Sequence, residues 1–286
     1  MDITRYRDPA VFLEATGELL TTSVAGNQVL LGVAAMAADQ PDVYPEFEGF
    51  VALDRGTPVL AATQTPPHNF ILSQGSKGDA VRPLCEAIAD AGLEVPGILG
   101  NRPLADRFAR VWADLTGVKP TELLRQGVFS LDRVQDVATA AGQMRDATEG
   151  DRETLIDWWE GFVAEAHPEM AAHGSSSAAE RVDLRLDPNR GQGLSVWVVG
   201  DRLASMSGYS PPVANSVRIG PVYTPPPLRG KGYATALVAA QSRRFLAEGR
   251  ERCLLHTDLA NPTSNAIYQR IGYRKVAEAV EYRFDG

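Results

Sequence analysis

The sequence has few cysteines and no long apolar segment. Only Cys85 and Cys253 occur in 286 residues. Two thiols so far apart, without metal-ligand spacing, favour buried reduced thiols of a cytoplasmic protein over a disulfide framework or a metal site. No apolar run approaches the roughly 20 residues that span a bilayer. The N-terminus, MDITRYRDP, carries no apolar signal segment. We therefore expect a cytoplasmic protein that has neither a metal site nor a membrane segment.

An excess of positive charge is also missing. The chain has 28 Lys and Arg against 36 Asp and Glu, a net charge of -8. Residues 220–286 nevertheless hold 10 basic against 6 acidic residues, and the remainder holds 18 against 30. An acidic body argues against nucleic acid as a partner. The basic C-terminal region suits a small polyanion.

The most informative stretch is residues 219–234, IGPVYTPPPLRGKGYA. An apolar strand over 217–223 is ended by three prolines, which cannot continue a ladder. The turn RGKGYA over 229–234 then leads directly into a helical segment, 235–248. Glycines allow close approach of the backbone, and the first-turn N–H groups of a helix attract anions. Because two cations flank the turn, the sequence predicts a pyrophosphate site.

Three glycine-rich turns could have this appearance. A P-loop requires Ser or Thr after its lysine, but Gly232 follows Lys231. A Rossmann turn requires a third glycine and an acidic residue about 20 positions later. This chain has Thr235 in place of the third glycine. The third pattern, R-x-x-G-x-A, is matched by Arg229, Gly232 and Ala234. It resembles the acyl-CoA pyrophosphate loop of the GNAT N-acetyltransferase superfamily.

A second motif strengthens this resemblance. Residues 259–273, LANPTSNAIYQRIGY, are similar to the family's last conserved region, in which a short helix carries N-x-x-x-N-A-x-x-Y. Asn261 is expected to cap that helix, with Pro262 in its first position and Gly272 at its end. Two motifs in the family's order identify residues 145–286 as a GNAT-like catalytic domain.

The resemblance implies a mixed α/β sheet and acetyl-CoA as cosubstrate, with a primary amine of a small molecule, amino acid or peptide as acceptor. The neutral amine attacks the thioester, and a tetrahedral intermediate expels the CoA thiol, whose pKa is near 8.5. Tyr268 matches the family's proton donor, and a purely packing role for it stays open. The implied coenzyme-binding residues are Val222, Tyr223, Thr224, Arg229, Gly230, Lys231, Gly232, Tyr233, Ala234, Thr235, Asn261 and Asn265.

No motif identifies the general base. Approximate topology places five candidates near the acceptor pocket of the family: Glu160, Glu165, His167, His256 and Asp258. A lysine acceptor of pKa near 10.4 needs such a base, whereas an amine of pKa near 8 needs little help. His68, which follows two prolines, is more typical of a turn.

The first half repeats the pattern of the second. Helices over 11–40, divided at 26–27, precede a hairpin over 47–63, a strand over 69–73, a helix over 79–91, a strand over 95–99 and a helix over 104–116. A strand pair is expected over 122–131. The turn 74–80 lacks the arginine and has Asp79 where an anion needs a donor. We therefore expect a tandem fold with a degenerate GNAT-like domain, 1–140, before the catalytic domain, 145–286.

Local signals organise the second half. Thr148 with Asp151, and Ser177 with Glu180, have the spacing of capping boxes that begin helices. A hairpin is expected over 194–209. The Ser- and Gly-containing segment 171–177 is either a substrate loop or a linker.

Two other functions remain open at this point. The chain could be a non-catalytic acyl-CoA-binding or regulatory protein, or a tandem transferase similar to mycothiol synthase. The sequence identifies neither the acceptor amine nor the oligomeric state.

Overall fold

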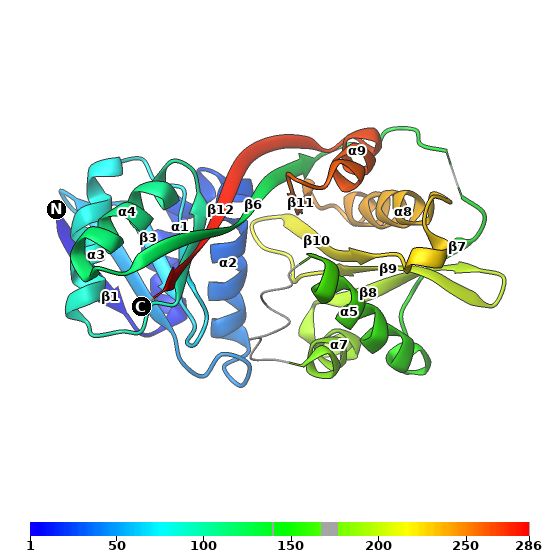
Figure 1. Ribbon diagram of the computed structural model, residues 1–286, viewed down its shortest axis with the longest axis horizontal. Coiled ribbons are helices and arrows are strands. Elements are labelled where there is room, and N and C mark those ends of the chain that lie inside the picture. Colours follow the sequence, from blue (N-terminus) through cyan, green and yellow to red (C-terminus); the bar gives the residue numbers. More distant parts are fainter. Residues whose placement is uncertain (139, 167–176, 286) are drawn as a thin grey trace. The chain divides into compact units, whose positions relative to one another are not determined.

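The structure is a computed structural model that describes residues 1–138, 140–166 and 177–285. The chain forms two compact units, each with its own hydrophobic core (Figure 1). Unit 1 comprises Met1–Val128 and Lys275–Gly286, and unit 2 comprises Phe129–Arg274. The bounds of these units differ from the predicted domains, 1–140 and 145–286, because the last segment of the chain belongs to unit 1.

Unit 1 is a mixed sheet with the order β1-β2-β3-β4-β5-β12-β6. Helices α3 and α4 pack with β2 to β5 in one core, and α1 and α2 contact β2 to β4. The elements are β1 Asp2–Tyr6, α1 Pro9–Thr21, α2 Val24–Asp39, β2 Glu48–Asp54, β3 Thr57–Gln64, β4 Phe70–Leu72, η1 Gly78–Ala80, α3 Val81–Asp90, β5 Gly97–Asn101, α4 Leu104–Thr116, β6 Lys119–Leu131 and β12 Arg274–Asp285.

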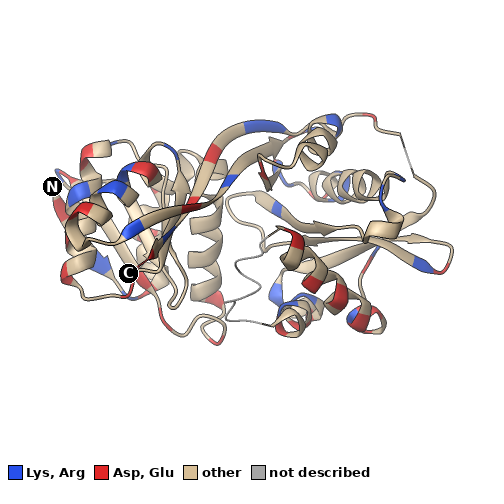
Figure 2. Cartoon of the chain, in the orientation of Figure 1, with Lys and Arg blue, Asp and Glu red and all other residues tan. Residues whose placement is uncertain are grey.

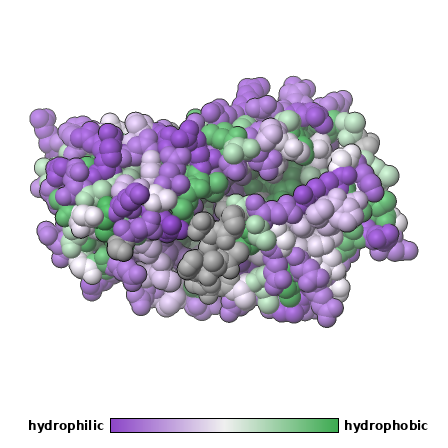
Figure 3. All heavy atoms as spheres, in the orientation of Figure 1, coloured by the Kyte–Doolittle hydropathy of each residue, from purple (hydrophilic) through white to green (hydrophobic). Residues whose placement is uncertain are grey.

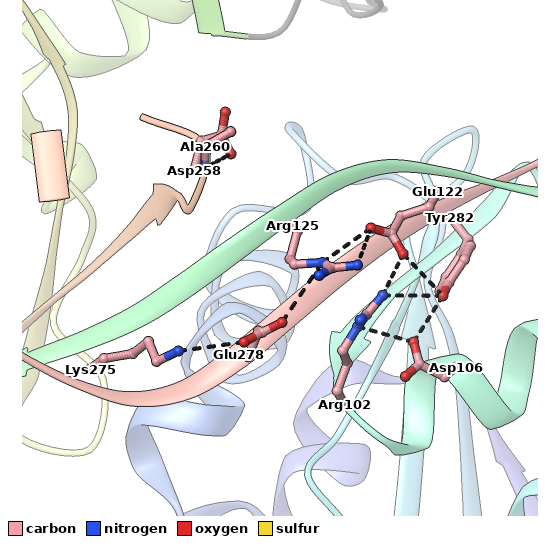
Figure 4. Close-up of polar contacts among 9 residues, drawn as sticks. All are labelled: Arg102, Asp106, Glu122, Arg125, Asp258, Ala260, Lys275, Glu278 and Tyr282. Carbon is pink, nitrogen blue, oxygen red and sulfur yellow. Dashed lines mark hydrogen bonds and ion pairs between the residues drawn. The ribbon is translucent and has the colours of Figure 1, made fainter. Parts of the chain in front are cut away.

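The C-terminal strand β12 completes the sheet of unit 1. It pairs antiparallel with β5 from Ala279 opposite Asn101 to Arg283 opposite Gly97, and Tyr282 and Phe284 pack on the core. Figure 4 shows the polar contacts that hold it: Arg125 lies between Glu122 and Glu278, and the Tyr282 hydroxyl donates to Asp106 at 2.9 Å. The prediction of a strand pair over 122–131 is wrong. That segment is part of one long strand, β6, and the distant C-terminus supplies its neighbour.

Unit 2 is a mixed sheet with the order β6-β11-β10-β9-β8-β7. Its elements, besides the end of β6, are β7 Gln143–Asp146, η2 Glu149–Asp151, α5 Arg152–Ala166, α7 Ala178–Leu186, η3 Pro188–Arg190, β8 Gly193–Val199, β9 Arg202–Tyr209, β10 Ser216–Tyr223, η4 Pro226–Leu228, α8 Tyr233–Ala247, β11 Arg252–Asp258 and α9 Pro262–Ile271.

Two helix pairs cover opposite faces of the unit 2 sheet. On β8, Val196 packs in the core of α5 and α7, whereas its neighbour Trp197 packs in the core of α8. Successive side chains of a strand point to opposite faces, so the two cores lie on the two sides of the sheet. Figure 1 shows α8 and α9 on one side of β8 to β10 and α5 and α7 on the other.

The local helix signals are largely confirmed. Both capping boxes are present, before η2–α5 and before α7, and Asn261 caps α9 by accepting the N–H of Ser264. Both cysteines are buried and free. The expected helix break at residues 26–27 is wrong. The helices separate at Thr22 and Ser23, whereas the side chain of Asn27, inside α2, donates to the carbonyl of Leu20.

The capping box of α5 contains a buried carboxylate that should make stability depend on pH. Asp151 accepts hydrogen bonds from both terminal nitrogens of Arg145 (2.6 and 2.8 Å) and from the Thr148 N–H (2.8 Å). The hydrogen bonds from Arg145, followed by those from Thr148, lower the pKa of Asp151 to about 2. A folded-state pKa below the unfolded value means that the contribution is complete above about pH 4 and is lost as pH falls through about 2.

We predict that Asp151→Asn lowers the free energy of unfolding by about 1 to 2 kcal/mol at pH 7. Because the parent carboxylate becomes protonated in acid, the difference between parent and variant should shrink between about pH 4 and pH 2. Urea unfolding at several pH values measures both effects. Asp201→Asn, in the exposed turn after β8, is the matched control, and a pH-independent difference for Asp151→Asn would contradict the prediction.

Candidate functional site

Strand β10 separates from β11 part of the way along its length. The parallel pairing runs only from Ser216 opposite Arg252 to Arg218 opposite Leu254. Pairing with β9 on the other side continues to Tyr223, with a shift in register between Ile219 and Val222. Gly220, inside this shift, has a φ of +142°, which favours glycine. The end of β10 therefore has one edge that does not pair with β11 among the described residues.

The turn after β10 presents backbone N–H groups. Gly230 and Gly232 have φ values of +77° and +80°, in the left-handed region that side chains disfavour. Gly232 is the N-cap of α8, and this helix start has no side-chain cap bond among the described residues. These N–H groups are free to bind an external anion, and the helix dipole favours negative charge at the same end.

A cavity of about 530 Å³ lies beside this turn and strand end. Its lining includes ten of the twelve predicted coenzyme residues, together with Tyr268: Val222, Tyr223, Thr224, Arg229, Gly230, Gly232, Tyr233, Ala234, Thr235 and Asn261. The tertiary structure thus brings the two sequence motifs to one cavity. Six further lining residues were not predicted from the sequence. Five of them belong to α9 and one to η4: Thr263, Ser264, Ala266, Ile267 and Arg270, and Leu228. In Figure 3 apolar residues gather in a hollow on this unit.

The two other predicted coenzyme residues do not line the cavity. Lys231 is exposed. The side-chain amide of Asn265 donates to the carbonyls of Asp258 (3.1 Å) and Leu259 (3.4 Å), so it fixes the turn between β11 and α9. Its Oδ1 is buried and has no partner among the described residues. That oxygen is thus a buried hydrogen-bond acceptor outside the cavity lining.

Tyr268 combines a packing contact with exposure to the cavity. Its ring lies edge-on to Tyr273 with centroids 6.1 Å apart, and the residue is 9% exposed. Burial raises the pKa of Tyr268 to about 12. The hydroxyl is therefore protonated at neutral pH and can act as a donor but not as a base.

Arg229 is held by protein groups. Its Nε donates to the carbonyl of Thr224 at 2.8 Å, and one terminal nitrogen lies 2.7 Å from both carboxylate oxygens of Glu165 on α5. Its guanidinium also lies 5.7 Å from the ring centroid of Tyr223. The residue expected to contact a pyrophosphate thus contacts a carboxylate.

The base candidates differ in their surroundings, and none of the described ones lines the cavity. Glu160 is exposed, and Glu165 is bound to Arg229. The carboxylate of Asp258 accepts the N–H of Ala260 at 2.8 Å (Figure 4). Burial and the nearby charge of Arg218 lower the pKa of His256 to about 3, so its ring is neutral and only weakly basic at neutral pH. His167 lies outside the described residues.

The corresponding turn of unit 1 is filled by protein groups. Asn27 Oδ1 accepts the backbone N–H of Gln74 at 2.6 Å, and Ser23 donates to the Gln74 side chain at 2.8 Å. Lys77 is paired with Asp54. Strand β4 is paired with β5 along all three of its residues, so no opening like that of β10 forms. His68 lies in the turn before β4, as expected, with its ring edge-on to Tyr44.

No group of three or more His, Cys, Asp or Glu residues in the described part of the chain is arranged to hold a metal ion. No helix in that part has the length and apolarity to cross a membrane.

Comparisons with known proteins identify relatives of this architecture. The family model for FR47-like proteins matches residues 214–283. An X-ray structure of a Drosophila protein has a TM-score of 0.68 at 13% identity, with 98% of each chain covered. A GCN5-related N-acetyltransferase from Sphaerobacter thermophilus has a TM-score of 0.59 at 17% identity, covering 98% of this chain and 95% of its own.

A tandem GNAT protein from the clavulanic acid biosynthesis pathway has a TM-score of 0.54 at 14% identity, with 98% of each chain covered. No curated protein matches the chain in sequence. At these identities the solved structures establish the fold, which is that of GNAT acetyltransferases with two halves.

Proposed function

We propose, from the confirmed resemblance to the GNAT superfamily and its fold, that this chain is an acyl-CoA-dependent N-acyltransferase. In its specific form, the proposal is transfer of an acetyl group from acetyl-CoA to a primary amine of a small molecule, amino acid or peptide. The observation that carries it is the cavity that joins the uncapped N-terminus of α8 to the unpaired edge of β10.

The described residues fit a coenzyme of this kind. The N–H groups from Gly230 to Thr235 suit the pyrophosphate, since the turn geometry leaves them without side-chain acceptors. The edge at the end of β10, which does not pair with β11 among the described residues, suits the amide groups of the pantetheine arm, which can pair with it as a strand would. Asn261, the N-cap of α9, lines the same cavity.

The reaction needs a nucleophilic amine, a polarised thioester and a stabilised leaving group. The amine attacks in its neutral form, and the carbon–sulfur bond breaks as the tetrahedral intermediate collapses to the amide and the CoA thiolate. The proton that the amine nitrogen gives up passes to solvent. We assign Tyr268 to the leaving sulfur, because its hydroxyl is protonated and its ring is held by the core. A donor of pKa about 12 is less acidic than a thiol near 8.5, so its main contribution is a hydrogen bond to the departing thiolate.

We assign coenzyme binding to the predicted catalytic domain, 145–286, and a supporting role to the degenerate domain, 1–140. In the corresponding turn of unit 1, Asn27 accepts the N–H of Gln74 and Lys77 is paired with Asp54, so both groups already have protein partners. One coenzyme per chain follows from this assignment. A cytoplasmic location remains a prediction from the sequence.

The first prediction from the proposed function tests the anion site. Gly232→Glu places a carboxylate at the N-terminus of α8, and acetyl-CoA should then no longer raise the melting temperature of the protein. The matched control is Gly249→Glu, because Gly249 has a similar φ of +89° and lies exposed after the same helix. Both variants carry the same backbone strain, so only Gly232→Glu should lose the shift. A normal shift in that variant would place the coenzyme elsewhere, for example in unit 1.

The second prediction tests the activity itself. A panel of amines, amino acids and short peptides is incubated with acetyl-CoA, and release of the CoA thiol is followed spectroscopically. At least one amine should accelerate release by more than tenfold over hydrolysis, with an acetylated product detected by mass spectrometry. Coenzyme binding without transfer to any member of a broad panel would instead favour the non-catalytic binding protein.

The third prediction concerns Tyr268. Tyr268→Phe keeps the ring packing and removes the donor, so turnover should fall about 10²-fold while acetyl-CoA affinity stays within a few-fold. Tyr273→Phe is the control, since that hydroxyl bonds Ser242 inside the same core and does not line the cavity. The Tyr273→Phe variant should lose stability but keep most of its turnover. Parental turnover in Tyr268→Phe would mean that Tyr268 only packs and that CoA leaves as the free thiolate.

A further inference from the structure

The Arg229 side chain has two protein partners: its Nε donates to the Thr224 carbonyl, and a terminal nitrogen donates to Glu165. The bond from its Nε to the Thr224 carbonyl ties it to the loop after β10. That loop is itself fixed to β9, because Ser205 Oγ donates to the Tyr223 carbonyl and lies 2.9 Å from the Thr224 hydroxyl. The Arg229 side chain lines the cavity and is 45% exposed. Its guanidinium is thus a fixed cation at the cavity mouth.

Glu165 reaches this cation from the last turn of α5. One terminal nitrogen of Arg229 lies 2.7 Å from both of its oxygens, and the Tyr223 hydroxyl donates to one of them at 3.4 Å. Gly161, one helical turn earlier, allows Tyr223 to lie against α5, because a Cβ there would stand 2.5 Å from the Tyr223 oxygen. The close packing of α5 on Tyr223 therefore delivers the carboxylate to Arg229.

We propose that Glu165 is an internal competitor of the coenzyme, an inference that rests on the proposed function. Its carboxylate holds Arg229 in the coenzyme-free protein, and a pyrophosphate oxygen takes its place when acyl-CoA binds. Carboxylate and phosphate present similar oxygen pairs to a guanidinium. The anchored cation cannot move away from the cavity to keep Glu165, so the two anions compete for the same terminal nitrogen of Arg229.

Replacing Glu165 by a phosphate oxygen at Arg229 costs little free energy, because this ion pair is exposed to solvent. Both side chains are about half exposed, and ion pairs of that kind contribute little to stability. Glu165 thus lowers coenzyme affinity by a small factor and keeps Arg229 oriented while the site is empty. Figure 2 shows further acidic residues along α5. Among them, Glu153 belongs to the first turn of the helix, whereas Glu165 belongs to the last, so Glu153 is a suitable control.

Calorimetric titration of the full chain with CoA tests the exchange. Glu165→Gln removes the competing charge and should bind CoA about 2- to 5-fold more tightly, the range expected for an exposed ion pair. Glu153→Gln makes the same charge change on the same helix, three turns away, and should leave affinity unchanged. In an Arg229→Met background, titrated to millimolar CoA, Glu165→Gln should have almost no effect, because no cation remains to compete for.

The outcomes separate this inference from the proposed function. Absence of CoA binding by the parent would overturn both. Binding by the parent, with Glu165→Gln unchanged or weaker, would overturn the exchange alone. A gain that persists in the Arg229→Met background would show general charge repulsion and would likewise overturn it.

Discussion

The separation of β10 from β11 after Arg218 is the constraint on which the site depends. A strand inside a sheet normally satisfies both edges, and unpaired buried N–H and C=O groups are costly. Here the register shift around Gly220 turns the strand end away from β11, and the prolines after Thr224 prevent it from continuing. The free edge, the glycine turn and the start of α8 then line one cavity. A ligand with amide groups and a pyrophosphate would satisfy all three.

The same cavity shows how one element can serve both packing and chemistry. Helix α9 buries Tyr268 and Ile271 in the core of unit 2 and lines the cavity with Thr263, Ser264 and Arg270. Its position is set by the Asn261 cap and by the Asn265 amide, which holds the preceding turn. A tyrosine on such a helix has little freedom to move, as a proton donor requires. Its packing role and its proposed chemical role therefore do not compete.

The glycine-containing turns of the two units differ in how their backbone N–H groups are bonded. In unit 2 the start of α8 has no side-chain cap bond among the described residues, whereas in unit 1 the Asn27 side chain accepts the N–H of Gln74 in the corresponding turn. An internal hydrogen bond of this kind stabilises the turn but takes up a backbone N–H group that an anion would need. A duplicated fold can in this way keep its architecture and lose a ligand site through a few polar side chains.

The sequence by itself determined the local features whose causes lie within a few residues. The caps at Thr148, Ser177 and Asn261, the Asp54–Thr57 hairpin and the glycine turn at 230–232 follow from short-range hydrogen bonding and from allowed φ values. The motif resemblance likewise indicated most of the cavity lining. Only the tertiary structure decided that β12 pairs with β5, that Lys231 and Asn265 lie off the cavity, and that Glu165 holds Arg229. Those contacts join residues far apart in the chain, and their partners depend on which elements pack together, which no local pattern specifies.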